Sequence, residues 1–330
     1  MKLQTEHNLP SGLDDFLQQS GWGESTVQPL PGDASFRRYF RVSGSANGNA
    51  MLMDAPPPHE NPRPFIEVAE YLTGHGFRAP KIYSKNLDRG LVLIEDFGDR
   101  RMREHLDAQP GDEAQIYMQA IDTLVDLTRT ECADLPPYDE AAYSREVRLL
   151  TEWYLPAMQL DFDQSEFDRM WNDALAPIAG TQVVTVLRDY HAENIMLLDD
   201  GAQGLIDFQD ALIGHPGYDL VSLLQDARRN VSTELETQML DYYIARAQPD
   251  YDFGHHYALI GAQRNTKIIG IFTRLWKRDG KLRYLDFLPR MWALLERDLN
   301  HPQLVALKNW FDTYIPQDIR KIAPNKLTPE

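Results

Sequence analysis

Short apolar runs separated by turns dominate the first part of the chain. Their length and their β-branched and aromatic residues predict strands of a small antiparallel sheet: Phe36–Val42, Ala50–Ala55, Lys81–Tyr83 and Leu91–Ile94. Pro64 to Leu72 instead has helical spacing, with proline in its first turn. We therefore expect residues 1–98 to form an N-terminal lobe built from this sheet and one packed helix.

From about Gly111 onward the apolar positions recur mostly at helical spacing. Ile116, Ala120, Leu124 and Leu127, for example, fall on one helix face. We expect residues 99–330 to form a larger, mainly helical lobe. The predicted fold class is α+β with two lobes.

One stretch, Val183–Ala211, interrupts this helical pattern. A buried strand is predicted for its first five residues, and a polar loop follows. Two further apolar runs, Ile195–Leu198 and Gly204–Ile206, flank Asp200-Gly201, which is a hairpin signal because both turn residues tolerate positive φ. The hairpin is expected to return Asp207 beside Asn194 and within reach of Asp189.

Two carboxylates and an amide that converge at strand ends suit phosphoryl transfer. Asp189 can orient an attacking hydroxyl, while Asn194 and Asp207 offer the hard oxygen ligands that Mg²⁺ prefers. A polar turn with side-chain caps uses the same residue types. The hairpin and the second aspartate favour the site over the turn.

The motifs in this stretch resemble a known family. Arg188-Asp189 with Asn194 resembles the catalytic loop of protein kinases, and Ile206-Asp207-Phe208 resembles their metal-binding motif. The short gap between them, and the segment Gly214–Leu220 (GHPGYDL), resemble the aminoglycoside phosphotransferase branch of that fold. The resemblance implies a bilobal protein-kinase-like fold, with ATP and Mg²⁺ as cofactors bound between an N-terminal nucleotide-binding lobe and a C-terminal catalytic and acceptor-binding lobe.

The resemblance also assigns roles in the loop and marks departures from the family. His191 stands where many protein kinases carry a lysine near the transferred phosphate, so it is a second catalytic candidate, expected to act when protonated. Leu187 replaces a histidine of the family that is mostly structural. Asp219 is expected to anchor the catalytic loop from below.

In the N-terminal lobe the resemblance gives a set of nucleotide-binding candidates: Gly32, Asp33, Ala34, Ser35, Arg37, Glu95 and Phe97. The first four form the turn over the phosphates, and the last two lie at the hinge beside the adenine. The phosphate-binding lysine of the third strand is absent, because that strand offers only Met51 or Met53. Candidates for the missing charge are Arg37, Arg38 and Arg41, and candidates for the helix glutamate that pairs with it are Glu67 and Glu70.

Several segments further resemble bacterial anomeric sugar kinases that act on N-acetylmuramate and N-acetylglucosamine: Pro31–Tyr39, Met53–Pro57, Leu187–Asn194, Gly214–Arg228 and Gln263–Asn265. The implied acceptor is the anomeric hydroxyl. Substrate-binding candidates are Asp210, Gln225, Asp226, Arg264 and Lys267. Arg264 and Lys267 are spaced to share a helix face, and Arg264 is suited to a lactyl carboxylate.

Two alternatives remain open on the sequence. One is a phosphotransferase for an aminoglycoside or another small alcohol, which the negative charge of the chain would suit. The other is a nucleotide-binding pseudokinase, suggested by the missing lysine. H-E-x-x-H, G-x-S-x-G, Walker A and Rossmann motifs are all absent from the sequence, which argues against hydrolase and dinucleotide-binding functions.

The composition of the chain limits the classes of partner that we expect it to bind. The net charge of −17 argues against a nucleic-acid binder, because phosphate-backbone binding relies on cationic side chains. No apolar run in the sequence approaches membrane-spanning length. The single cysteine, Cys132, cannot form an internal disulfide. We expect a cytoplasmic monomer that acts on a small sugar.

Overall fold

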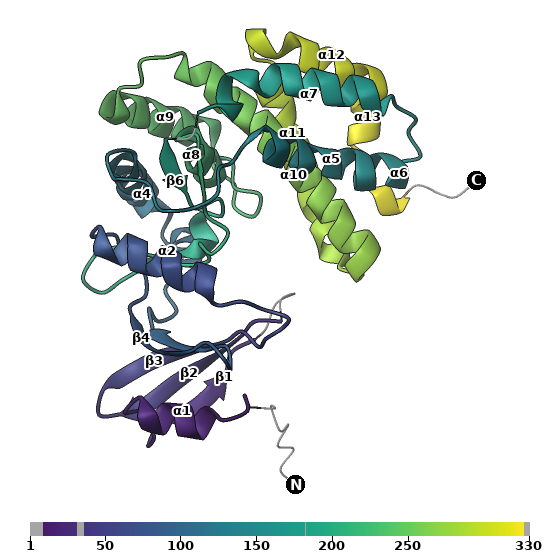
Figure 1. Cartoon of the computed structure of the whole chain (residues 1–330). Coiled ribbons are helices and arrows are strands. Elements are labelled where there is room, and N and C mark those ends of the chain that lie inside the picture. The colour runs from purple at the N-terminus through teal and green to yellow at the C-terminus, as the bar shows by residue number, and fades with distance from the viewer. Residues whose placement is uncertain (1–8, 32–35, 182, 327–330) are drawn as a thin grey trace. The chain divides into compact units, whose positions relative to one another are not determined.

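The computed structural model describes residues 9–31, 36–181 and 183–326, and it divides into two compact units (Figure 1). The first comprises 1–108 together with 193–210, and the second comprises 109–192 together with 211–330. This division differs from the boundary expected at residue 98. Backbone hydrogen bonds explain the difference, since the Leu205 N–H donates to the Arg78 carbonyl (2.7 Å) and the Leu197 N–H to the Arg100 carbonyl (2.8 Å).

The first unit is built on a five-stranded antiparallel sheet with the strand order β1-β2-β3-β5-β4. The strands span Thr26–Pro29 (β1), Arg38–Ser45 (β2), Gly48–Asp54 (β3), Ile82–Asn86 (β4) and Leu91–Glu95 (β5). Phe40, Leu52 and Leu93 are aligned across three strands and share one face. Helix α1 (Leu13–Gln19) covers that face and completes a hydrophobic core with it.

The opposite face of the sheet carries Tyr39, Met53 and Val92 in register. Helix α2 (Arg63–Gly74) lies on the other side of the sheet from α1 (Figure 1). The ring of Phe65 in α2 stacks on Phe208, with centroids 5.1 Å apart. The first unit also contains α3 (Met102–Ala108).

The predicted hairpin is confirmed as β7 (Ile195–Leu197) and β8 (Gln203–Leu205), joined through Asp200-Gly201. Gly201 has φ +83°, as such a turn requires. Gly204 is required for a different reason: a Cβ at this position would lie 2.6 Å from the ring of Phe97. Its lack of a side chain lets Phe97 pack against the hairpin.

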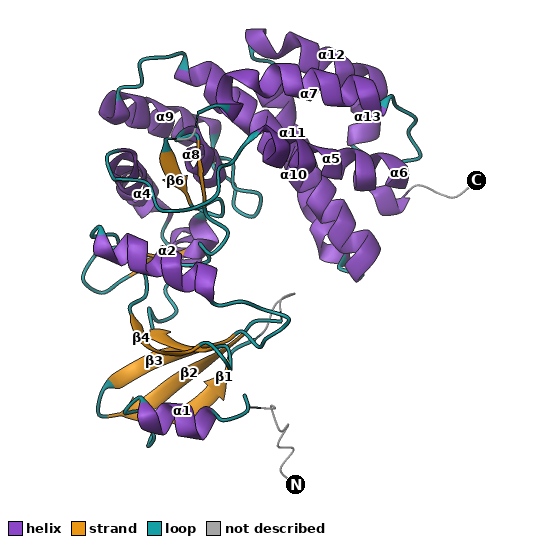
Figure 2. Ribbon diagram, in the orientation of Figure 1, coloured by secondary structure: helices purple, strands orange, loops and turns teal. Residues whose placement is uncertain are grey.

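The second unit is mainly helical (Figure 2). Its helices span Glu113–Thr128 (α4), Glu140–Leu149 (α5), Leu155–Ala157 (α6), Gln164–Ala179 (α7), Gly217–Leu224 (α8), Thr233–Ala247 (α9), Phe253–Asp279 (α10), Leu288–Leu299 (α11), Val305–Tyr314 (α12) and Gln317–Arg320 (α13). The predicted α+β class with a sheet-based and a helical part is confirmed.

Helix α10 packs against α5, α8 and α11 and is the central element of the second unit. The Asp252 side chain caps its first turn by accepting from the His255 N–H (3.1 Å), and Gly280 in the left-handed region ends it. A Cβ on Gly270 would lie 2.3 Å from the backbone of Leu149, so the glycine permits the close approach of α10 to the end of α5.

A two-stranded ladder of β6 (Val184–Val186) and β9 (Leu212–Gly214) completes the second unit. All three residues of β6 are buried. The polar loop with Asp189 follows β6 directly, and α8 with Asp219 follows β9. No helix among the described residues combines the length and the apolar character needed to cross a membrane.

Candidate active site

Asp189 lies between two very tight turns in the second unit. Its N–H donates to the Leu187 carbonyl (2.9 Å), and its own carbonyl accepts from the His191 N–H (3.1 Å). Arg188, at the centre of the first turn, has φ +69°. Such a turn with positive φ is rare and strained. The local backbone therefore fixes the candidate base on both sides.

Asp219 anchors this loop, as predicted. The residue is buried in α8, and its two carboxylate oxygens accept the N–H groups of Leu187 (2.6 Å) and Arg188 (2.8 Å). Burial raises the pKa of Asp219 to about 7, against the effect of these two N–H donors, which favour the charged form. The Asp219 side chain thus holds both backbone N–H groups at the strained turn.

His191 is buried, and its Nε2 lies 3.3 Å from Nη1 of Arg228. An arginine can only donate, so Nε2 must carry a lone pair and the ring must be neutral. Burial also lowers the pKa of His191 below its ordinary value of 6.5. The imidazole is therefore uncharged near neutral pH, and this argues against the expected role as a protonated catalytic group.

The state of His191 predicts a pH dependence of stability. Its folded-state pKa is lowered, so its stabilising contribution is present above the unfolded value of 6.5 and is lost as the pH falls through the folded value. Between about pH 7.5 and about pH 5.5, the free energy of unfolding should fall more in the wild type than in His191→Gln, which keeps an acceptor for Arg228. Urea unfolding of both proteins measures this. An equal fall in the two would contradict it.

Asp226 and Arg264 belong to the same cluster as His191. The charges of Asp226, Asp189 and Arg264 all affect the pKa of His191. Asp226 Oδ1 accepts the backbone N–H of Arg228 (2.7 Å), and Arg264 Nη2 donates to Ser222 Oγ (2.7 Å). Asp226 Oδ2 and Arg264 Nη1 are buried and have no hydrogen-bond partner among the described residues. Two polar groups beside the candidate base are thus left for a ligand.

The other three substrate-binding candidates lie in different surroundings. Gln225 is only 1% exposed; its Nε2 donates to Asp298 (2.9 Å) and its Oε1 accepts from Asn265 (2.7 Å). We correct its role to a structural one, because both ends of the amide are occupied. Lys267 Nζ donates to Glu146 (3.0 Å) and to the Tyr218 hydroxyl (3.2 Å). Asp210 is exposed at the end of the hairpin segment, in the first unit.

Asn194 and Asp207 lie side by side in the first unit, as the hairpin predicted. Asn194 Nδ2 is 3.3 Å from Asp207 Oδ2, and the Ile206 N–H donates to the Asn194 carbonyl (3.1 Å). Gln209, which is not among the predicted site residues, donates to Asp207 Oδ1 (2.9 Å). Within the described ranges no group of three or more His, Cys, Asp or Glu is placed to hold a metal. An amide and a carboxylate nevertheless suit Mg²⁺, which keeps several waters and takes phosphate oxygens.

The three arginines that could replace the missing strand lysine have different partners in the structure. Arg38 donates to the buried Asp54 (2.9 Å), and Arg41 donates to Asp99 (2.8 Å). Arg37 forms an ion pair with Glu60 (3.4 Å). Burial raises the pKa of Tyr39, and the charges of Arg37, Asp207 and Glu60 act on the same hydroxyl. The Arg37–Glu60 pair is therefore the one near the metal-binding candidate.

Glu60 was not among the predicted partners of this cation. Of the two glutamates expected to fill that place, Glu70 pairs with Lys85 (2.7 Å) at the surface, and Glu67 is exposed. Met53, which pairs with Tyr39 across strands β2 and β3, is buried. The turn residues Gly32, Asp33, Ala34 and Ser35 lie outside the described residues.

At the hinge, the Glu95 carboxylate is occupied. Arg78 donates to both of its oxygens at 2.7 Å and lies over the ring of Phe97, 4.9 Å from the centroid. The hydrogen bonds from Arg78 lower the pKa of Glu95, so the pair is charged. The Glu95 N–H also donates to the Lys81 carbonyl (2.9 Å), so neither the carboxylate nor this N–H is available to a nucleotide.

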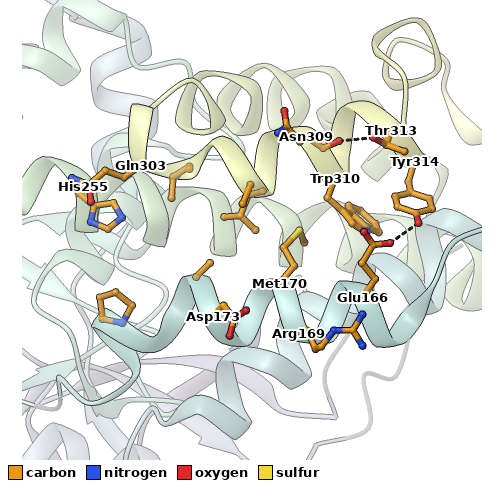
Figure 3. Close-up of a pocket in the computed structure, with 15 residues that line it drawn as sticks. Glu166, Arg169, Met170, Asp173, His255, Gln303, Asn309, Trp310, Thr313 and Tyr314 are labelled. Carbon is orange, nitrogen blue, oxygen red and sulfur yellow. Dashed lines mark hydrogen bonds between the residues drawn. The ribbon is translucent and has the colours of Figure 1, made fainter.

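A separate groove of about 680 Å³ lies between α7 and α12 in the second unit (Figure 3). Glu166 and Met170 line one wall, and Trp310 and Tyr314 line the other, with a hydrogen bond of 2.5 Å from the Tyr314 hydroxyl to Glu166. None of the predicted site residues lines it. We do not assign the chemistry to this groove.

Comparison with known families identifies the family of the chain. A model of the phosphotransferase enzyme family (APH) matches residues 26–257, which include the loop of Asp189, both metal-ligand candidates and Asp219. The chain belongs to the phosphotransferase enzyme family. The resemblance to the aminoglycoside phosphotransferase branch is thereby confirmed, and the protein is an enzyme that transfers a phosphoryl group. The pseudokinase alternative is set aside.

Two bacterial relatives are similar over most of their length. The N-acetylmuramate/N-acetylglucosamine kinase of Caulobacter vibrioides is 35% identical, over 97% of this chain and 100% of that protein. The protein of the same name from Pseudomonas aeruginosa is 37% identical, over 91% of this chain and 92% of that protein.

Two solved structures share the fold of this chain. A choline/ethanolamine kinase family protein from Mesorhizobium loti gives a TM-score of 0.62 at 13% identity, covering 89% of this chain and 95% of that one. An ADP-bound aminoglycoside phosphotransferase gives 0.58 at 16% identity, covering 82% and 92%. These similarities confirm the protein-kinase-like fold.

Proposed function

We propose that this phosphotransferase is an ATP- and Mg²⁺-dependent sugar kinase that acts on the anomeric hydroxyl of N-acetylmuramate or N-acetylglucosamine. The names of the two bacterial relatives support this acceptor. The observation that carries it in the structure is Arg264, a buried cation with a free N–H beside the cluster of Asp189 and His191. A carboxylate on the acceptor would satisfy it.

In the proposed reaction Asp189 orients the sugar hydroxyl and receives its proton. The anomeric oxygen forms a bond to the γ-phosphorus, the bond from that phosphorus to the β–γ bridging oxygen breaks, and ADP leaves with the electron pair. The tight turns around Asp189 hold its backbone in place before the substrate arrives. This preorganisation lowers the barrier because no loop has to be ordered during the reaction.

On the nucleotide side, Asn194 and Asp207 would hold Mg²⁺, which would neutralise charge on the phosphates. Gln209 keeps the Asp207 carboxylate oriented. Arg37 would supply the positive charge that the third strand lacks, with Glu60 fixing its direction as a helix glutamate does in other members of the fold. The carbonyl of Glu95 and the backbone of Phe97 would meet the adenine.

On the acceptor side, Asp226 and Arg264 would bind the sugar. Asp226 Oδ2 can accept from a sugar hydroxyl, and Arg264 Nη1 can donate to the lactyl carboxylate of N-acetylmuramate. N-acetylglucosamine has no such carboxylate, so a comparison of the two sugars isolates the proposed contact between Arg264 and the carboxylate.

Arg264→Met should raise the KM for N-acetylmuramate by about 10- to 100-fold, because hydrogen bonds to charged groups contribute roughly 1.5–3 kcal/mol. The KM for N-acetylglucosamine should change by less than about threefold. Steady-state ADP release with each sugar measures both. Lys277→Met, which removes an exposed cation from the same helix, is the matched control and should behave as the wild type. Equal effects of Arg264→Met on the two sugars would contradict the assignment.

The acceptor class itself is tested with a panel of the two amino sugars, an aminoglycoside and choline, each with Mg²⁺ and ATP. Turnover of an amino sugar supports the proposal. Turnover of only the aminoglycoside or only choline would retain the phosphotransferase and reject the sugar. A monomeric state and a cytoplasmic location remain predictions from the sequence.

A further inference from the structure

Arg188, the strained residue before the candidate base, is held at both polar groups of its backbone. The Arg188 N–H donates to Asp219 (2.8 Å), and its carbonyl accepts from Ser222 Oγ (3.2 Å). A non-glycine residue at φ +69° costs on the order of 1–2 kcal/mol. Such a conformation persists only where the surroundings enforce it. The side chain of Arg188 can also hold this conformation through the contacts that it makes.

That side chain ends on Glu146, a buried carboxylate in α5 that lies forty-two residues earlier in the chain. Arg188 Nη2 donates to Glu146 Oε1, and its guanidinium lies over the ring of Tyr138, 5.5 Å from the centroid. Burial acts to raise the pKa of Glu146, but Lys267 and Arg188 outweigh burial and lower it. The contact is therefore a charged one at neutral pH.

Glu146 is itself held rigidly by three further donors. Lys267 Nζ donates to Oε1 (3.0 Å), while the Tyr138 hydroxyl and Gln263 Nε2 (3.3 Å) donate to Oε2. These donors come from the loop before α5 and from α10, the central helix of the unit. A carboxylate fixed from two directions is a firm anchor for one guanidinium.

We propose that Glu146 is a positioning residue for phosphoryl transfer, which holds the strained turn at Arg188 and thereby fixes the direction of the Asp189 carboxylate. This inference rests on the proposed function in so far as Asp189 is the base. Glu146 acts through Arg188 and need not touch nucleotide or sugar. Its loss should therefore lower kcat and leave the KM values nearly unchanged, since misplacing a catalytic group by about 1 Å costs on the order of 100-fold in rate.

The test compares Glu146→Gln, Arg188→Met and the double variant in kcat on N-acetylmuramate. Glutamine keeps the size and removes the charge. Each single variant should lose roughly 10- to 100-fold in kcat, with the KM for ATP within about twofold of the wild type. The double variant should lose no more than the worse single variant, because the two residues act through one contact. A product of the two single losses would overturn the proposal.

Controls separate this role from a purely structural one. Arg148 lies in α5, as Glu146 does, and forms an exposed ion pair with Asp168. Arg148→Met removes this pair and should retain full kcat. Circular dichroism and nucleotide binding establish that each variant is folded, and a folded Glu146→Gln with wild-type kcat would reject the proposal. If that variant does not fold, Glu146→Asp takes its place, since it keeps the charge and withdraws it from Arg188 by one methylene.

The inference and the proposed acceptor can fail separately. The wild type is assayed first on the acceptor panel, and the Glu146 comparison then uses whichever alcohol is turned over. Loss of kcat with a non-sugar acceptor would reject the sugar and support Glu146. Turnover of a sugar, with additive losses of kcat or no loss of kcat in the Glu146 comparison, would support the sugar and reject the role of Glu146.

Discussion

Replacing Asp189 with Asn should lower kcat by about 10²–10⁴-fold, the range that a positioned general base contributes. Asparagine has nearly the size of aspartate and leaves the turns intact, because these turns use only the backbone of residue 189. It cannot take the proton of the attacking hydroxyl. The KM for ATP should stay within about threefold, since Asp189 is not a nucleotide ligand in the proposed mechanism.

The measurement is steady-state kinetics on the acceptor that the wild type turns over, with thermal unfolding to establish that the variant is folded. A matched control is Asp199→Asn, which changes an exposed aspartate in the turn of the hairpin. The control should retain wild-type kcat. A loss of less than about tenfold in Asp189→Asn would remove this residue from the role of base.

Replacing Asp207 with Asn should have the second largest effect, a fall in kcat of about 100-fold or more. A bound divalent ion contributes several kcal/mol of transition-state stabilisation, and each 1.36 kcal/mol is tenfold in rate. Asparagine retains an oxygen ligand and the contact with Gln209 but removes the negative charge. The variant should therefore need a higher Mg²⁺ concentration and recover part of its activity when Mg²⁺ is raised.

A titration of activity against Mg²⁺ at saturating ATP tests this directly. Asp199→Asn again serves as the control, because it lies in the same hairpin and should leave the Mg²⁺ dependence unchanged. If Asp207→Asn had the Mg²⁺ dependence of the wild type and a reduced kcat, the residue would act on the reaction in a way other than metal binding.

The hairpin and the loop before it could be predicted from the sequence because their signals are local. Apolar runs on either side of Asp200-Gly201 predict the turn, and the turn places Asp207 next to Asn194. The anchoring role of Asp219 was also predicted; its motif, Gly214–Leu220, comes after the hairpin in the chain.

Contacts between distant parts of the chain left no such local signal. Glu60 pairs with Arg37 across twenty-three residues, and Glu146 meets Arg188 across forty-two. Gln225, a substrate-binding candidate on the sequence, is a structural residue in the fold. Its partners, Asn265 and Asp298, lie in α10 and α11, and only the packing of these helices shows that the amide is fully used.

The charge of His191 also depended on tertiary structure. The resemblance places His191 where many protein kinases carry a lysine and so suggests a cation, yet Arg228 approaches its Nε2 and burial lowers its pKa. The sequence gives the position of the ring but not its protonation state.

The most direct test of the central claim is phosphorus NMR of the wild-type enzyme with Mg²⁺, ATP and N-acetylmuramate, beside Asp189→Asn. We predict a sugar 1-phosphate that is labile in acid, formed together with ADP and absent with the variant. Phosphate on another hydroxyl, or release of inorganic phosphate without any sugar phosphate, would contradict the assignment of this enzyme as an anomeric sugar kinase.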